Sequence, residues 1–242
     1  MENRPNNGGY LFLMIGIIVG AIILTYGLMN IKGDDSVISV KGYAELNVSS
    51  DYTVWRIVVN SRSPILSDAF ASLTKSKNRV YQFLESNGIN REQIGETSLY
   101  TETINNYQSE SYSNQTIKGY FMNQSIVVES KDIKMIQQLS LQINDLLSEG
   151  IDINSNPPEF YVSELNKYKV KMLGEALQDA KKRADEIAGS VGNSIGGLKS
   201  ARQGIFQITP LNSTEVSDWG INDVSSVEKT IKSVVDASFY IK

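Results

Sequence analysis

The sequence contains one pattern that is typical of covalent catalysis. Gly192, Ser194 and Gly196 match G-x-S-x-G, the turn in which α/β-hydrolases expose a nucleophilic serine between a strand and the helix that follows it. Here the helical periodicity stops before Gly192 and a strand pattern begins near Leu198, which is the reverse of the order that the motif needs. These glycines also follow a helix C-terminus, whose partial negative charge disfavours phosphate. We therefore interpret the segment as a helix cap and turn.

Two missing residue types restrict the chemistry further. The 242 residues include no Cys and no His, so imidazole bases, thiolate nucleophiles, disulfides and Cys or His metal ligands are excluded. Carboxylate, Lys, Tyr or Ser chemistry and oxygen-ligated metals remain, but these need converging acids, and no acidic cluster stands out. We expect no enzymatic activity, no catalytic residues, no cofactor and no bound metal. The enzymatic alternative is a hydrolase with two carboxyl groups about 5 to 10 Å apart.

Charge argues against a nucleic-acid partner. The formal net charge is −4 and the pI is near 5.1, so the chain lacks the basic character that drives phosphate binding. Residues 181–183 form a short basic run, but three acids lie within residues 179–186. Mixed signs at this spacing are typical of a solvated helix face.

Three aromatic residues lie in polar stretches and are possible partner contacts. Trp219 lies within TPLNSTEVSDWGINDVSS, and Tyr107 and Tyr112 lie within NNYQSESYSN. Aromatic side chains on exposed loops often anchor a partner, but they can also fold back over the edge of their own core. The sequence leaves both interpretations open.

The elements that hold these residues follow from the spacing of the apolar side chains. Alternation predicts strands over residues 38–48, 54–59, 95–104, 117–130, 159–162, 198–208 and 227–241. Apolar residues at three- and four-residue steps predict helices over residues 67–87, 132–147 and 163–191. The first two strands are expected to form a hairpin through Ser49, Ser50 and Asp51. The order ββαββαβαββ predicts an α+β fold with an antiparallel or mixed sheet packed with helices.

The longest helix carries a distinctive row of small residues. Ala176, Ala180, Ala184 and Ala188 recur at four-residue steps, which allows a sheet or another helix to approach closely. We expect this ridge to pack within the domain, with an oligomer seam as the alternative. The buried stripe is predicted to comprise Leu165, Tyr168, Met172, Ala176, Ala180, Ala184, Ile187 and Val191.

The N-terminus predicts a membrane anchor. Residues 10–29 carry no charge, and about 20 helical residues span roughly 30 Å of hydrocarbon. Since no A-x-A-like cleavage site follows, we expect a retained anchor. Gly16 and Gly20 form G-x-x-x-G, through which two anchors could pack.

These features predict the following organisation. Residues 1–9 form a cytoplasmic stub, residues 10–29 a single N-terminal transmembrane helix, residues 30–36 a linker and residues 37–242 the α+β domain. We expect a single-pass protein of the cell membrane whose soluble domain is extracytoplasmic, either periplasmic or external.

The soluble part resembles the SIMPL-domain family of bacterial and archaeal envelope proteins. The resemblance rests on ISVKGYAELNVSSD, FLESNGINREQIGETSLY, IKGYFMNQSIVVESKDIKMIQQL and EALQDAKKRADEIAGSVGNSIGGL. The family often has Ala-Pro near the first turn, where this chain has Ser49, Ser50 and Asp51. The resemblance implies an exported or membrane-anchored protein, ring-like or other homo-oligomers, and an association with envelope or oxidative-stress tolerance. It implies no catalytic residues.

Together these observations predict a non-enzymatic, membrane-anchored protein that self-associates into a homo-oligomer. The first alternative is a ligand- or partner-binding, chaperone-like envelope module, which should expose an apolar patch larger than a few hundred Å². The second is the carboxylate-dependent hydrolase. The sequence does not identify a protein partner.

Overall fold

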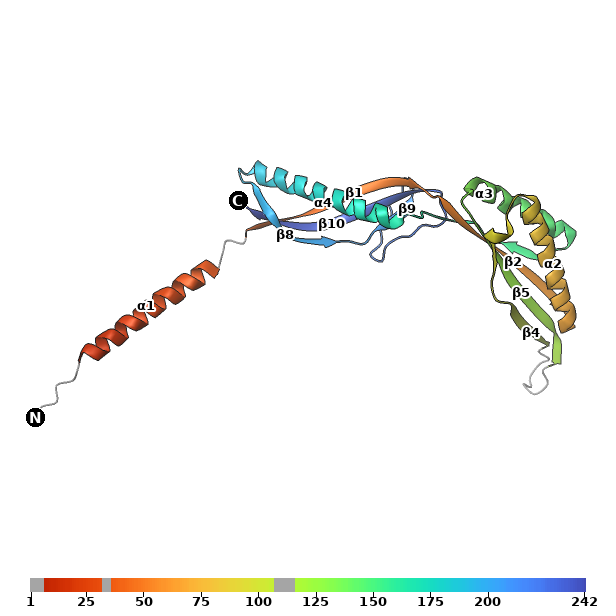
Figure 1. Ribbon diagram of the computed structural model, residues 1–242, viewed down its shortest axis with the longest axis horizontal. Coiled ribbons are helices and arrows are strands. Elements are labelled where there is room, and N and C mark those ends of the chain that lie inside the picture. Colours follow the sequence, from red (N-terminus) through yellow and green to blue (C-terminus); the bar gives the residue numbers. More distant parts are fainter. Residues whose placement is uncertain (1–6, 32–35, 107–115) are drawn as a thin grey trace, which may run out of the picture. The chain divides into compact units, whose positions relative to one another are not determined.

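A computed structural model describes residues 7–31, 36–106 and 116–242 (Figure 1). Side chains are described for these residues except 7–11, 28–31, 106 and 116. Tyr107 and Tyr112 therefore lie outside the described residues. The chain divides into two compact units, the first made of residues 1–43, 176–203 and 235–242 and the second of residues 44–175 and 204–234.

The predicted α+β class is confirmed. The helices are α1 (Asn7–Ile31), α2 (Leu66–Ser86), α3 (Ile133–Gln142) and α4 (Leu165–Ser190), with short 3-10 helices η1 (Arg91–Gln93) and η2 (Ile143–Glu149). The strands are β1 (Val37–Ser49), β2 (Tyr52–Ser63), β3 (Ile94–Glu96), β4 (Tyr100–Asn106), β5 (Thr116–Ser130), β6 (Ile153–Ser155), β7 (Glu159–Tyr161), β8 (Ile195–Gln203), β9 (Gln207–Pro210) and β10 (Glu228–Ile241). One sheet has the order β1-β10-β8, with β9 also paired to β10. The other has the order β3-β5-β2-β6, with β4 on β5 and β7 on β2.

In the first unit, the C-terminal half of α4 packs against β1 through the alanine ridge. Ala176, Ala180, Ala184 and Ala188 are all buried. Their small side chains let β1 come so close that a Cβ added to Gly42 would lie 2.0 Å from the Ala176 carbonyl oxygen and 2.7 Å from the Ala180 Cβ. The ridge therefore packs on a strand of its own unit, as the sequence predicted.

Two members of the predicted stripe on α4 are exposed, and Leu165 and Tyr168 are only half-buried. Ile187 is 51% exposed and Val191 is 71% exposed. Ile187 precedes Ala188 by one residue, which turns its side chain by about 100° away from the ridge. Val191 lies beyond the last residue of α4. The prediction that these two residues belong to the core was wrong.

In the second unit, β2 and β5 form the centre of a sheet that α2 and α3 cover. Its core comprises Trp55, Ile57, Val59, Leu73, Val80, Leu84, Ile126, Val128, Ile136 and Leu139, among others. The Trp55 Nε1–H donates a hydrogen bond of 3.1 Å to Ser155 Oγ, so the largest buried side chain also has its polar group satisfied. Helix α2 ends before Gly88, which has φ +89°, as expected for a glycine that follows a helix C-terminus.

The predicted hairpin between the first two strands was wrong. β1 pairs with β10, whereas β2 pairs with β5, β6 and β7, so β1 and β2 belong to different sheets. The Ser50 amide donates to the Val227 carbonyl oxygen at 2.9 Å, and the Asp51 amide donates to the Tyr161 carbonyl oxygen at 3.0 Å. The backbone amides that a hairpin would have paired locally thus donate hydrogen bonds to segments that are distant in the sequence. The chain therefore continues from one sheet into the other instead of turning back.

Smaller differences concern strand boundaries. The strand expected over residues 95–104 is divided into β3 and β4, and the strand expected over 198–208 is divided into β8 and β9. Strand β6 was not predicted; it is only three residues long, too short for alternation to be recognised.

The junction of β1 and β2 yields a pH-dependent prediction. The Asp51 carboxylate accepts hydrogen bonds from the Ser163 amide at 2.8 Å and from Ser163 Oγ at 2.5 Å, and the side-chain bond is the largest cause of a lowered Asp51 pKa. Because the folded pKa is lowered, the contribution of Asp51 is present above its unfolded pKa and is lost as the pH falls through the folded value. We expect the free energy of unfolding to fall less steeply below about pH 4 in Asp51→Asn than in the wild type. The difference should be less than about 1 kcal/mol, because Asp51 is exposed. Urea unfolding at neutral and acid pH measures this, and an unchanged acid decline in Asp51→Asn would contradict it.

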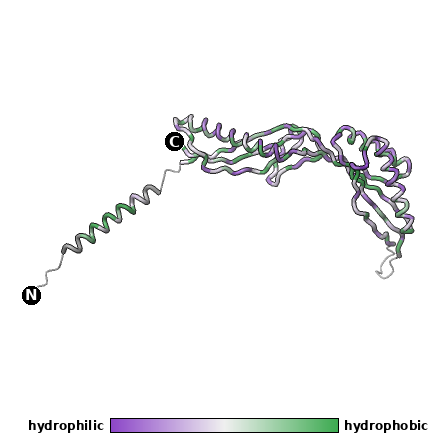
Figure 2. Tube along the Cα trace, viewed as in Figure 1, coloured by the Kyte–Doolittle hydropathy of each residue, from purple (hydrophilic) through white to green (hydrophobic). Residues whose placement is uncertain are grey.

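The described side chains of α1 are almost entirely apolar and exposed. Figure 2 shows the hydrophobic colouring along the helix, and exposed residues include Phe12, Ile15, Ile18, Ile22 and Tyr26. Among the residues that the structure describes, however, no helix is both long and apolar enough to span a membrane. The transmembrane helix predicted over residues 10–29 is therefore unsupported by the structure. At Gly16 and Gly20 an added Cβ would meet no atom within 4 Å, and their role in anchor packing stays a prediction.

Candidate interaction site

Among the described residues of the second unit, the most exposed large apolar side chain belongs to Trp219. It is 93% exposed and lies in the segment between β9 and β10. Of the two interpretations that the sequence left open, the structure thus places the indole in solvent rather than over a core edge. Its contact with a partner remains a prediction.

A buried glutamine holds the turn that presents Trp219. Gln207, the first residue of β9, donates from Nε2 to the Ser217 carbonyl oxygen at 2.7 Å and accepts from the Ile221 amide at 2.8 Å. Within the turn, the Trp219 amide donates to Ser217 Oγ at 3.2 Å. The Gly220 amide donates to the Ser217 carbonyl oxygen at 3.1 Å, with φ +85° at Gly220. The indole is therefore carried by an ordered turn clamped on both sides.

The chain beyond the turn is tied to β9. The Ile208 amide donates to the Ile221 carbonyl oxygen at 2.7 Å, and the Asp223 amide donates to the Ile208 carbonyl oxygen at 2.9 Å. These bonds form a parallel bridge between Ile208 and Asn222. Because the turn is already ordered, binding of a partner at Trp219 loses little further conformational entropy.

Other apolar side chains of the same region are also exposed. Ile205, Leu211 and Val216 are exposed, and Ile205 Cγ2 lies 2.8 Å from the position of a Cβ added to Gly220, which places Ile205 against the turn. We refer to Ile205, Leu211, Val216 and Trp219 as the Trp219 loop. Trp is one of the residue types most enriched in protein-binding hot spots.

A buried ion pair follows the Trp219 loop. The Lys229 side chain is only 2% exposed, and its Nζ lies 2.6 Å from the Asp223 carbonyl oxygen and 3.4 Å from Asp223 Oδ2. Burial lowers the pKa of Lys229, and the Asp223 carboxylate opposes that shift. Burial acts to raise the pKa of Asp223, but hydrogen bonds from Ser225 and Ser226, together with the Lys229 ammonium, hold it below its usual value. We interpret the pair as charged and structural.

Sequence reasoning missed both Gln207 and Lys229, although Lys229 left a signal. It lies in the same alternation phase as Ile231, Val235, Ala237 and Phe239 of β10, all of which are buried. A lysine in the inward phase of a strand predicts a buried charge that needs a partner. Gln207 carries no such signal, because its partners lie in the irregular segment that follows.

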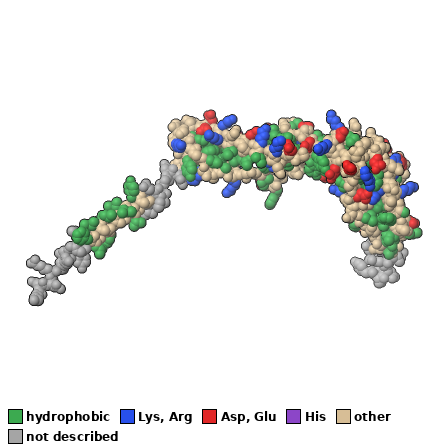
Figure 3. Space-filling model, viewed as in Figure 1, with side chains coloured by type: hydrophobic (Ala, Val, Ile, Leu, Met, Phe, Trp, Pro, Cys, Tyr) green, Lys and Arg blue, Asp and Glu red, His purple; other side chains and the backbone are tan. Residues whose placement is uncertain are grey.

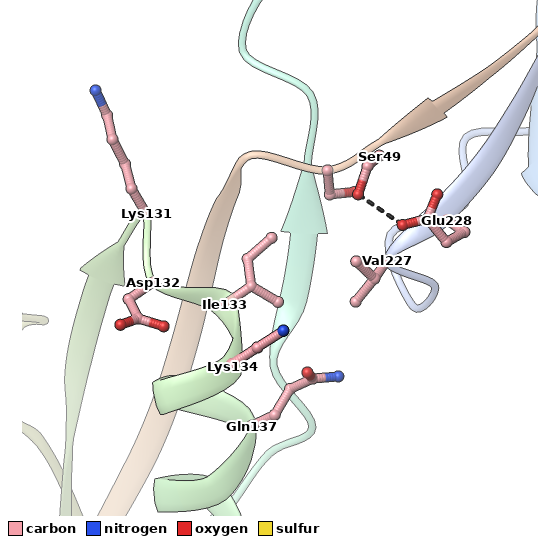
Figure 4. Close-up of a pocket in the computed structure, with 9 residues that line it drawn as sticks. Ser49, Lys131, Asp132, Ile133, Lys134, Gln137, Val227 and Glu228 are labelled. Atoms are coloured by element: carbon pink, nitrogen blue, oxygen red, sulfur yellow. Dashed lines mark hydrogen bonds between the residues drawn. The ribbon is translucent and has the colours of Figure 1, made fainter.

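A polar pocket lies in the second unit between the start of α3, the end of β1 and the start of β10 (Figure 4). Its volume is about 820 Å³. Ser49 Oγ donates to Glu228 Oε1 at 2.7 Å on one side. Figure 4 shows the Lys134 ammonium pointing toward Val227 and Glu228, whereas Lys131 and Asp132 point away from them. Ser50, which also lines the pocket, is buried with no hydrogen-bond partner for its Oγ among the described residues.

The densest ionisable network centres on Glu96. Its carboxylate accepts from Lys77 Nζ at 2.7 Å, from Gln124 Nε2 at 3.0 Å and from the Tyr81 hydroxyl. Burial acts to raise the pKa of Glu96, but the bonds from Lys77 and Tyr81 hold it below its usual value. Burial and the Glu96 carboxylate raise the pKa of Tyr81 to about 12. A single carboxylate neutralised by a lysine is a structural cross-link rather than the carboxyl pair of a hydrolase.

The interpretation of the G-x-S-x-G segment is confirmed. Helix α4 ends at Ser190, Gly192 has φ +79°, and β8 begins at Ile195. The Ser194 amide and carbonyl group pair with Lys242 through bonds of 3.1 and 2.8 Å. Ser194 therefore lies where a strand begins, on the wrong side of a helix for a nucleophile elbow.

Comparisons with known proteins agree with the resemblance found in the sequence. A family model described as SIMPL, protein of unknown function (DUF541), matches residues 38–239. The uncharacterized protein YggE of Edwardsiella ictaluri (strain 93-146) is 24% identical over 172 residues, which cover 70% of this chain and 68% of that protein. Neither description assigns an activity. Because the family model covers most of the chain, including both compact units, the protein belongs to the SIMPL family.

Proposed function

We propose that this protein is a non-enzymatic, membrane-attached envelope protein whose extracytoplasmic α+β domain self-associates. The observation that carries the proposal is the Trp219 loop, in which a 93% exposed indole is held by a clamped turn. Large aromatic side chains are costly to leave in water, and they dominate the energetics of protein interfaces. A second copy of this chain is the occupant that we assign to the loop.

Two features support attachment to a membrane. Residues 10–29 contain no charged side chain, and the described apolar side chains of α1 are exposed. Figure 3 shows these hydrophobic side chains on the surface of α1. A helix that is apolar on every side requires cover by lipid or protein. Support of envelope or oxidative-stress tolerance is the cellular role that we propose for the attached assembly.

Substitution of Trp219 tests the assembly. We expect Trp219→Ala to weaken self-association of residues 36–242 at least about thirtyfold, the effect of losing a hot spot worth about 2 kcal/mol. Its unfolding free energy should change by less than about 0.5 kcal/mol, because an exposed indole contributes little to the folded monomer. Sedimentation velocity over a concentration series measures the first quantity and urea unfolding the second.

Leu141 provides the matched control. This exposed apolar residue of α3 also lies in the second unit, so Leu141→Ala removes a comparable exposed side chain away from the Trp219 loop. Association should be unchanged in Leu141→Ala. Equal association in wild type and Trp219→Ala would remove the loop from the interface.

The polar pocket in Figure 4 favours a second candidate, a ligand-binding module. Its specific observation is the buried Ser50 hydroxyl without a partner among the described residues, in a pocket that the Lys134 ammonium also enters. A small carboxylate could accept hydrogen bonds from both groups. Nuclear magnetic resonance titration with acetate should shift the Ser50 and Lys134 amide signals in the wild type and not in Lys134→Gln. Absence of saturable shifts would count against this candidate.

A further inference from the structure

Strand β1 of the first unit has an open edge. It is the outermost strand of the order β1-β10-β8, so its other side pairs with no strand among the described residues. The Ile241 amide donates to the Ser36 carbonyl oxygen at 2.9 Å, and Lys41 pairs with Asp236 at 2.6 Å, which defines one antiparallel register. Backbone groups alternate in direction along such a ladder, so those of Ser39 and Lys41 point away from β10 to the open edge.

Helix α4 covers only part of this edge. Beside Tyr43, the Asp179 carboxylate of α4 accepts a hydrogen bond of 2.8 Å from the outward amide. Within the part of the chain that the structure describes, no residue outside the sheet accepts a hydrogen bond from the Ser39 or the Lys41 amide. Unpaired amides on a strand edge are a template for pairing with another chain.

A hollow of about 600 Å³ borders the uncovered part of the edge. It is lined by residues 39–41 of β1 and by Lys182, Arg183, Glu186 and Ile187 of α4. Val40 is half-buried and Ile187 is 51% exposed, so the hollow combines apolar with charged side chains. Strand addition needs this combination of free backbone groups at an edge with an apolar contact for alternate side chains.

The charges beside the hollow are complementary to a second copy of themselves. Arg183 is held by Asp179 at 2.7 Å, whereas the structure gives Lys182 and Glu186 no ion pair with any residue that it describes. A two-fold axis brings the same surface of two copies together, with the two α4 helices running in opposite directions. Lys182 of each copy can then meet Glu186 of the other, which makes two attractive pairs.

Strand β8 forms the other open edge of this sheet and fits the hollow less well. Its two charged residues, Lys199 and Arg202, are both basic. Placing β8 of a second copy beside β1 would therefore add positive charge next to Lys41 and Lys182. Like charges on neighbouring strands are destabilising, so the strand that fits the edge of β1 is β1 of a second copy.

We propose that two copies of this chain pair through β1, antiparallel and about a two-fold axis at Val40. The proposal rests on the self-association proposed above and assigns to it a contact in the first unit, separate from the Trp219 loop. In this register, Ser39 of each copy exchanges backbone hydrogen bonds with Lys41 of the other. Val40 lies opposite Val40 of the second copy, and the two sheets become continuous.

The absence of Cys makes a direct test possible, because one introduced Cys can form a disulfide only with a second copy. The two Val40 residues would form a non-hydrogen-bonded pair with Cα atoms about 4.5 Å apart, which is within the range of a disulfide. The full chain in mild detergent is oxidised with copper phenanthroline and resolved on a non-reducing gel. We expect Val40→Cys to give a disulfide-linked dimer at least about tenfold faster than the control, Ile38→Cys.

Ile38 is a matched control for accessibility. It is half-buried, as Val40 is, and lies two residues away in the same strand, which places it on the same face. In the proposed register, however, Ile38 lies opposite Gly42 of the second copy. The two Ile38 residues are then four positions, or roughly 14 Å, apart, too far for a disulfide.

A charge exchange on α4 tests the contact between side chains. With Val40→Cys present, Lys182→Glu or Glu186→Lys alone should slow cross-linking about fivefold, because each converts two attractive pairs into two repulsive ones. The two changes together should restore the rate to within about twofold, since the exchanged charges are again complementary. Failure of the combined variant to recover would contradict the two-fold contact.

The outcomes separate this pairing from self-association in general. Equal cross-linking of Val40→Cys and Ile38→Cys in a chain that still forms multimers would overturn the β1 pairing and leave self-association intact. Faster cross-linking of Val40→Cys to Ala201→Cys of β8, in a mixture of the two variants, would assign the edge to β8 instead. Cross-linking of Val40→Cys should persist in Trp219→Ala, because the two contacts lie in different units. A chain that neither cross-links nor forms multimers would overturn both proposals.

Discussion

Replacement of Gly42 by alanine is expected to destabilise the protein by about 3 kcal/mol, the upper end of the usual cost of overpacking. A Cβ at this position would lie 2.0 Å from the Ala176 carbonyl oxygen and 2.7 Å from the Ala180 backbone nitrogen. These are backbone atoms of a helix, so they cannot move aside as the end of a flexible side chain can. Strand β1 and helix α4 would have to separate along the alanine ridge. Urea unfolding followed by far-ultraviolet circular dichroism measures the loss.

Gly197 supplies the control for this substitution. It also lies in a strand of the first unit, but a Cβ added there would meet no atom within 4 Å. Gly197→Ala should change the unfolding free energy by less than about 0.5 kcal/mol. A loss below about 1 kcal/mol in Gly42→Ala would mean that α4 does not approach β1 as closely as described.

Removal of the Asp223 carboxylate is the second substitution with a large expected effect. Asp223→Ala leaves the Lys229 ammonium, 2% exposed, without its counter-charge, and breaking a buried pair in this way costs about 3 to 5 kcal/mol. We expect the lower end, about 3 kcal/mol, because the Asp223 carbonyl oxygen still accepts from Lys229. Adding Lys229→Met should restore much of the loss, since the buried charge then disappears. Equal instability of the single and double variants would show that the backbone bonds to Asp223, rather than charge, account for the effect.

The pH dependence of this ion pair has a defined sign. The Asp223 pKa is lowered in the folded state, so its contribution is present above the unfolded pKa and declines as the pH falls through the folded value. The Lys229 pKa is also lowered, so the unfolded state binds more protons than the folded state between the two Lys pKa values. Stability should therefore rise with pH in that alkaline range, and Lys229→Met should abolish the rise.

The sequence was most informative where a pattern depends on local geometry. The row from Ala176 to Ala188 predicted close approach because four-residue spacing places small side chains on one line of a helix. Gly192 predicted a helix end, and it adopts the left-handed conformation that favours glycine there. In each case the physical cause lies within a few residues of the pattern.

The sequence was least informative about which distant segments meet. Alternation identified the residues of β1 and β2 but not their partners, and the Ser50 amide pairs with Val227 instead of closing a hairpin. Ile187 is as apolar as a core residue, yet one helical position separates it from the ridge. The clamp on Trp219 depends on Gln207, whose partners Ser217 and Ile221 follow in a segment without periodicity.

Trp219 illustrates the difference between the position of a side chain and its contact with a partner. Its polar neighbours identified a loop aromatic, and the structure adds exposure and an ordered turn. Contact with a partner is a property of two molecules, and self-association through Trp219 therefore requires a measurement of association.

Light scattering of residues 36–242 across a concentration series tests self-association most directly. We expect a discrete multimer whose mass is a whole multiple of the monomer and whose population falls in Trp219→Ala. A chain that stays monomeric throughout the series would contradict self-association through this domain and would favour the ligand-binding alternative at Ser50 and Lys134.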